Sequence, residues 1–244
     1  MIQALFAKEK PNFLIIMTDD QTYESIHSLN NHEINTPNMD KLVKNGTTFT
    51  YAFNQGSWTG AVSVASRTML ITGQNVVNAQ KNSTYIVNWA RTTSPEEEIE
   101  VKLLGEVMKE AGYETFITGK WHNTDESLLR SFQKGKAVAY GFYETTDENG
   151  SREFAYSRPN GSVWTPWNQH YKGHWSPEVR DLSLTDNRQE ISAPYTVNQH
   201  TSELFADEAV RYLKEKKENP FFMYVSFNAP HDPQIGRASC RERV

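Results

Sequence analysis

The sequence predicts an α/β protein with a mostly parallel sheet, because strand-like apolar runs alternate with amphipathic helical segments. Residues 12–18 and 220–227 are continuous apolar runs, which are typical of buried strands in a parallel sheet. Residues 101–111 and 201–216 carry apolar side chains at helical spacing. With 244 residues, the chain is long enough to bury a substantial core.

Four shorter segments complete the expected pattern. Residues 36–45 predict a helix, because a Thr and a Pro stand at its start and Gly46 follows its end. Residues 47–53 alternate between apolar and polar side chains and favour a strand. Residues 63–71 indicate a helix, and residues 114–118 indicate a short strand.

Composition excludes several classes of function. The net charge of −5 and the absence of a long Lys/Arg run give no reason to expect nucleic-acid binding. No apolar stretch approaches the span of a bilayer, so a transmembrane protein is not expected. Cys240 is the single cysteine, which rules out an intramolecular disulfide.

Residues 131–195 differ from the rest, because they are polar, weakly periodic and rich in Gly, Pro and aromatic residues. We expect an irregular insertion on the substrate side, since long irregular segments are often functional. Its rings form either a small satellite core or a wall for stacking sugars, and composition does not decide between them: Trp164, Trp167, His170, Tyr171, His174 and Trp175.

Polar residues follow three of the predicted strands, namely Asp19 and Asp20, then Lys120 and His122, then His231. Ligands of open parallel sheets bind outside the carboxyl ends of the strands, so we expect these five side chains on one rim.

Each of these groups has a plainer interpretation. Asp19 and Asp20 either end a strand in a capping turn or form a hard oxygen site suited to Ca²⁺ or Mg²⁺. Lys120 and His122 are either a solvated lysine and a helix-capping histidine or a clamp for anionic oxygens. His231 either satisfies a turn or takes part in catalysis. A zinc site is less favoured, because no closely spaced cysteine pair exists.

The segment Ser63-Val-Ala-Ser-Arg67 opens a predicted helix and suits the binding of a tetrahedral oxyanion. A helix N-terminus offers free N–H groups and the positive end of the helix dipole, and Arg67 adds a permanent charge. The context of Ser63 is not G-x-S-x-G, which disfavours a serine of the α/β-hydrolase type. Neither a P-loop nor a dinucleotide fingerprint occurs.

Taken together, these motifs resemble the sulfatases of the alkaline-phosphatase superfamily over residues 11–234. The resemblance rests on five segments in the family's order: residues 11–20, residues 36–42, Ser63 to Arg67, residues 119–122 and residues 229–231. It implies an alkaline-phosphatase-like, mostly parallel sheet flanked by helices.

The resemblance also implies a modified serine and a metal. Asp19, Asp20 and the modified Ser63 would bind one Ca²⁺. Ser63 would be converted to formylglycine, whose hydrate attacks sulfur. A serine rather than a cysteine at this position implies a maturase of the anaerobic type.

The remaining roles follow from the same resemblance. Arg67 would support the hydrate and the metal site, Lys120 and His231 would hold sulfate oxygens, and His122 would orient the hydrate or discharge the sulfated intermediate. The implied activity is that of a sulfuric ester hydrolase acting on a sulfated carbohydrate in the periplasm or outside a bacterial cell. The alternatives are a phosphoesterase that uses Ser63 directly and a non-catalytic binding remnant.

Both ends of the chain depart from the family pattern. The second metal-ligand pair and a further lysine, which the family carries well downstream of His231, do not follow, and residues 235–244 leave the pattern. We therefore expect a fold incomplete at the C-terminus, an artefactual tail and a fragment that is inactive alone. Residues 1–10 are either a disordered terminus or the remnant of a signal peptide.

Overall fold

The computed structural model describes residues 10–58, 62–86, 101–139, 144–146, 152–154, 174, 177–186 and 188–231. Within these residues one mixed sheet is built from β1 (Phe13–Met17), β2 (Glu114–Lys120), β3 (Lys134–Ala139), β6 (Glu178–Thr185), β7 (Arg188–Ile191), β8 (Tyr195–Thr196) and β9 (Phe221–Ser226). The strands β4 (Glu144–Thr146) and β5 (Arg152–Phe154) pair separately. The helices are α1 (Pro37–Asn45), α2 (Val62–Thr72), α3 (Val76–Ile86), α4 (Leu104–Glu110), α5 (Asp125–Ser131) and α6 (Thr201–Lys214).

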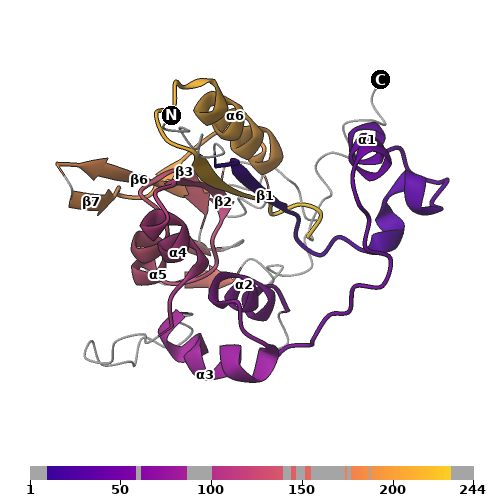
Figure 1. The fold of residues 1–244 in the computed structure, drawn as a ribbon, viewed down its shortest axis with the longest axis horizontal. Coiled ribbons are helices and arrows are strands. Elements are labelled where there is room, and N and C mark those ends of the chain that lie inside the picture. The colour runs from indigo at the N-terminus through magenta and orange to yellow at the C-terminus, as the bar shows by residue number, and fades with distance from the viewer. Residues whose placement is uncertain are drawn as a thin grey trace, which may run out of the picture.

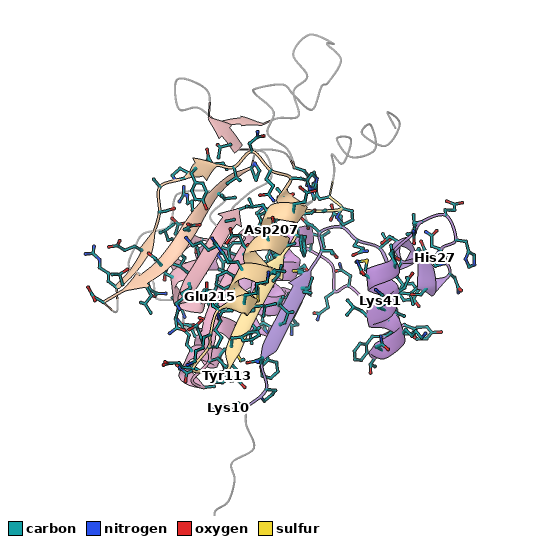
Figure 2. All side chains as sticks on the ribbon, turned by 90° about the horizontal axis from the view of Figure 1, so that it is seen from above. Lys10, His27, Lys41, Tyr113, Asp207 and Glu215 are labelled. Carbon is teal, nitrogen blue, oxygen red and sulfur yellow. The ribbon has the colours of Figure 1, made fainter. Side chains whose placement is uncertain are left out.

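The sheet has the order β1-β9-β2-β3-β6-β7, with β8 paired to β6. The pairs β1–β9, β9–β2 and β2–β3 are parallel, whereas β6 runs antiparallel to β3 and to β7. This arrangement confirms the predicted α/β class with a mostly parallel sheet flanked by helices. Figure 2 labels Lys10 and Tyr113 near the amino ends of β1 and β2, so the carboxyl ends of these strands lie at the opposite edge of the sheet.

Helices cover both faces of the sheet, with α6 on one side and α2, α4 and α5 on the other (Figure 1). Successive residues of the central strands point to opposite faces. Ile117 and Tyr224 therefore join the core beneath α2 and α5, while Phe116 and Met223 pack with Tyr212 of α6. Because both faces are covered, the residues of β9 are buried on either side, which explains why β9 is a continuous apolar run.

Helix α1 lies apart from the sheet in both views, where Lys41 and His27 are labelled in Figure 2. Its start is held by local bonds, because Asp40 accepts hydrogen bonds from the Ser28 amide and the Thr36 hydroxyl, both at 3.0 Å. The extended chain after α1 leads back to α2 at the body of the molecule (Figure 1).

Three sequence predictions about the elements were wrong. Residues 47–53 form no strand, and Phe49 and Tyr51 are 78% and 85% exposed. Alternation favours an extended chain, but a strand also needs a neighbour for its backbone hydrogen bonds. Strand β1 was expected to be buried, yet it lies at an edge of the described sheet with Ile16 56% exposed.

The segment 131–195 was expected to be irregular, and the structure corrects this for the part it describes. Strands β3, β6 and β7 all come from this segment and extend the main sheet. Strands β3 and β7 have six and four residues, and β6 has eight but is mostly polar. Strand β6 also pairs with β3 across a register shift at Gly135 and Val138, so apolar and polar residues do not alternate regularly. Of the aromatic and histidine residues noted there, His174 is described.

Residues 1–9 and 232–244 lie outside the described residues, and so do the predictions that fall on them. In the part of the chain that the structure describes, no helix is both long and apolar enough to cross a membrane.

Strand β2 approaches β9 closely at one glycine. Gly119 has φ +93°, and a Cβ built on it would overlap the backbone carbonyl of Ser226. A residue with a side chain would push the two strands apart at the carboxyl end of the sheet, directly before Lys120. Gly73, after α2, also has a positive φ of +65°, but nothing lies within 4 Å of a Cβ built there.

We predict that Gly119→Ala lowers the free energy of unfolding by about 3 kcal/mol, because backbone strain and steric overlap both contribute. Gly73→Ala is the matched control, with a loss of about 1 kcal/mol from the positive φ alone. Denaturant unfolding monitored by circular dichroism measures both. Equal losses in the two variants would contradict the close approach of β2 to β9.

Candidate active site

The carboxyl ends of three adjacent parallel strands form one rim of the sheet. Met17 of β1 and Gly119 of β2 both lie opposite Ser226 of β9 in the strand register. Asp19 and Lys120, which follow within two residues, therefore reach the same point above the sheet. The structure thus brings together residues more than 100 positions apart, as the sequence predicted from the strand ends.

Asp19 is the centre of a buried charge cluster. Its carboxylate accepts a hydrogen bond from Lys120 Nζ and lies 3.5 Å from Arg67 Nη1. Asp19, Arg67 and Lys120 are only 2%, 1% and 1% exposed. Because two cations share one carboxylate, the cluster has an excess of positive charge, which suits an anionic ligand at the rim.

Arg67 is held in place from two elements. It lies four residues after Ser63 in α2, so both side chains are on the same face of the helix. Its Nη2 donates a hydrogen bond to the Ser226 hydroxyl at 3.0 Å, at the end of β9. Ser226 therefore fixes the Arg67 guanidinium against the sheet.

Ser63 is the second residue of α2 as the structure describes it, close to the free amides of the helix start. Its Oγ lies 3.5 Å from Nδ1 of His122, which follows β2. His122 has a positive φ of +62°, which turns the chain after Trp121. The side chain of Thr124, not His122, accepts the capping hydrogen bond of α5, from the Ser127 amide. The helix-capping interpretation of His122 is therefore wrong.

His231 lies on the loop that follows β9. Its Nε2 is 3.5 Å from a carboxylate oxygen of Asp20, and its amide donates to the carbonyl of Asn228 at 3.1 Å. The Asp19 amide donates to the Ala229 carbonyl at 3.1 Å, which ties this loop to the end of β1. Asp20 has a positive φ of +60° and an exposed side chain, so it faces outward from the buried cluster.

The electrostatics of the rim keep His122 neutral. Burial, with the positive charges of Lys120 and Arg67, lowers the pKa of His122 to about 2. Burial and the Arg67 charge also lower the pKa of Lys120, and Asp19 opposes this shift. A neutral His122 beside Ser63 is able to accept a proton from the serine oxygen.

The residues described here contain no group of three or more His, Cys, Asp or Glu side chains placed to hold a metal. Asp19 and Asp20 offer the hard oxygens that Ca²⁺ prefers, but Ca²⁺ takes about six to eight oxygen ligands. The Asp19 carboxylate also contacts two cations in this structure. The donor chemistry therefore fits Ca²⁺, while the ligand set is partial.

Two residues that shape the rim have no recognisable signal in the sequence. Ser226 belongs to the predicted strand of residues 220–227, and only the strand register places it opposite Gly119. His174 was noted among aromatic residues, but its hydrogen bond to the His231 carbonyl, at 2.8 Å, joins segments 57 residues apart. No local pattern predicts such a contact.

The fold and the rim define an α/β protein in which a serine at a helix N-terminus lies beside a histidine that is close to two buried cations. The sulfatase family model matches residues 11–241, so the chain belongs to the sulfatase family. It is similar to an arylsulfatase of Klebsiella aerogenes, with 27% identity over 233 residues, covering 93% of this chain and 44% of the relative. An N-acetylgalactosamine-6-O-sulfatase of Bacteroides thetaiotaomicron is 25% identical over 272 residues, covering 93% and 49%.

Solved structures share the fold. BT4656, in complex with its substrate D-glucosamine-2-N,6-O-disulfate, has a TM-score of 0.59 at 21% identity, over 92% of this chain and 35% of that one. Ps i-CgsB in complex with k-i-k-neocarrahexaose has a TM-score of 0.62 at 23% identity, over 92% and 46%. The chain spans less than half the length of each of these four proteins.

We predict that Asp19→Asn destabilises the protein by about 3–5 kcal/mol, because it leaves two buried cations without a counter-charge. Asp20→Asn is the matched control, and its exposed carboxylate should change the stability by less than about 1 kcal/mol. Both are measured by denaturant unfolding in the presence of EDTA. A loss for Asp19→Asn no larger than the control would contradict the buried charge cluster.

We also predict that stability falls on acidification. Burial lowers the pKa of His174 from 6.5 to about 4, so the unfolded chain binds this proton first as the pH falls. Its contribution is complete above pH 6.5 and is lost between pH 6.5 and about 4, with a slope of up to about 1.4 kcal/mol per pH unit. His174→Gln should flatten the measured stability profile in that window. An unchanged profile would contradict a buried neutral His174.

Proposed function

We propose that the protein is a sulfuric ester hydrolase that removes sulfate from a sulfated carbohydrate. The observation that carries this proposal is the placement of Ser63, at the start of α2, beside His122 and the buried Lys120–Asp19–Arg67 cluster. This placement occurs in a chain of the sulfatase family. The carbohydrate class is supported by relatives and solved neighbours whose names contain sulfated sugars. The activity is proposed for the whole protein, because this chain spans under half of those relatives.

The rim residues have distinct proposed roles. Lys120 and His231 bind the non-bridging oxygens of the sulfuryl group, and the amides at the start of α2 add hydrogen bonds. Arg67 supports the group at residue 63 and offsets the negative charge of the sulfuryl group. His122 accepts the proton of the oxygen at residue 63 while that oxygen bonds to sulfur and the ester S–O bond breaks. The leaving oxygen takes up a proton from water and departs as the alcohol, and the sulfuryl group is left on the oxygen of residue 63.

We further propose that Ser63 is oxidised to formylglycine by a maturase of the anaerobic type. The hydrate of that aldehyde would supply the attacking oxygen. Asp19 and Asp20 would hold one Ca²⁺, which would offset charge on the transferred group. Two carboxylates are a partial ligand set for Ca²⁺, so further ligands would come from residues other than those that the structure describes. A periplasmic or secreted location fits a polysaccharide substrate.

A second candidate is a phosphoesterase that uses the Ser63 hydroxyl directly. It is favoured by the 3.5 Å distance between Ser63 Oγ and a neutral His122, which is the geometry of a nucleophile and its base. A third candidate is a protein that binds sulfated sugars without turnover.

We predict that co-expression with an anaerobic-type maturase removes two hydrogens from Ser63, seen by peptide mass spectrometry. Ser66, in the same helix, is the internal control and stays unmodified. The modified full-length protein should hydrolyse sulfate esters faster than phosphate esters, and Ser63→Ala should lose this activity. Unmodified Ser63 with a preference for phosphate would overturn the sulfatase proposal. Binding of a sulfated oligosaccharide without turnover would favour the third candidate.

A further inference from the structure

His174 lies between the start of α6 and the loop that carries His231. It is 3% exposed, and its Nε2 donates a hydrogen bond to the carbonyl oxygen of His231 at 2.8 Å. A carbonyl only accepts, so this bond requires a proton on Nε2. His174 is the one residue of the segment 155–176 that the structure describes.

The other side of His174 is fixed to α6. Its backbone carbonyl accepts a hydrogen bond from the Thr201 amide at 2.8 Å, and its Nδ1 lies 3.2 Å from the Thr201 hydroxyl. With Nε2 protonated and the ring neutral, Nδ1 must accept from that hydroxyl. Thr201 is fully buried, so the tautomer and the orientation of the ring are both set by a rigid helix start.

The stacking of His200 on this ring restricts it further. The two ring centroids are 5.4 Å apart with an angle of 11° between the planes. His200 is itself the N-cap of α6, because its Nδ1 accepts from the Ser202 amide at 3.2 Å. His174 therefore sits in a site built on α6 and projects one donor toward the rim.

The His231 loop depends on such a donor. Its backbone is tied to β1 through the bond from Asp19 to Ala229 and closed by the bond from His231 to Asn228. The carbonyl of His231 follows its amide along the backbone, and it accepts the hydrogen bond from His174. These three bonds together set the peptide planes on both sides of His231 and so the direction in which its ring leaves the backbone.

We propose that His174 is a positioning residue, which holds the His231 carbonyl so that the His231 imidazole points at the anionic group bound on the rim. Through this hydrogen bond, the start of α6 restrains the loop after β9. Positioning matters because a misplacement of about 1 Å at a catalytic group costs on the order of 100-fold in rate. The positioning role depends on the proposed function of His231. The hydrogen bond between His174 and His231 is observed in the structure and does not depend on that function.

The first test follows the histidine rings by NMR in the 244-residue chain labelled with ¹⁵N-histidine, whose seven histidines give few signals. In the wild type, the His174 ring should show an Nε2-protonated neutral tautomer. His174→Phe should remove that signal and shift the ring signals of His231. His174→Gln, whose amide donor reaches the same carbonyl, should restore the His231 signals.

His200→Asn is the matched control, because asparagine keeps the N-cap acceptor and removes the stacked ring. It should leave the His231 signals near their wild-type positions. Circular dichroism and denaturant unfolding report whether each variant is folded. Unshifted His231 signals in a folded His174→Phe chain would overturn the proposal. An equal shift in His200→Asn would also overturn it, since packing alone would then explain the effect.

The second test uses the matured full-length protein. His174→Phe should lower kcat for a sulfate ester by about tenfold or more while KM changes by less than about twofold, and His174→Gln should recover most of the loss. If His174 had a purely structural role, its substitution would lower the amount of folded enzyme. It would not lower kcat selectively over KM, and His174→Gln would not restore kcat. If the wild type hydrolyses no sulfate ester, the proposed function fails, and the NMR result still decides whether His174 positions His231.

Discussion

The carboxylate of Asp19 is the group on which the rest of the rim depends, because two cations from different elements converge on it. Lys120 comes from the end of β2 and Arg67 from α2, and all three side chains are almost fully buried. Removing charges from water is costly, and the mutual attraction repays that cost only when the geometry is good. The cluster therefore requires that β1, β2 and α2 keep their relative positions.

The sheet supplies that geometry through close packing at one point. Gly119 lets β2 lie against the Ser226 carbonyl of β9, and the Ser226 hydroxyl in turn binds Arg67. Strand β9 lies between β1 and β2, so it sets the distance between Asp19 and Lys120. Stability and site geometry are thus determined by the same few contacts, and a change at the strand ends affects both.

The rim has a rigid interior and a more open outer side. Asp19, Lys120 and Arg67 form the interior, whereas Asp20 and His231 are partly exposed and meet at 3.5 Å. An anionic ligand would approach from this outer side, where the loop after β9 carries His231. The interior holds its charges fixed before any ligand arrives, which is the form of electrostatic preorganisation that favours charged transition states.

The sequence by itself determined the fold class, the strands β1, β2 and β9, the helices α1, α2, α4 and α6, and the gathering of Asp19 and Lys120 at one edge. These follow from local periodicity, and parallel strands end at the same side of a sheet. Tertiary structure decided the rest. The strands β3 and β7 are short, β6 is longer but mostly polar, and residues 47–53 lack the partner that a strand needs. The bonds of Arg67 to Ser226 and of His174 to His231 join distant segments, so only the packed sheet and helices bring those groups together.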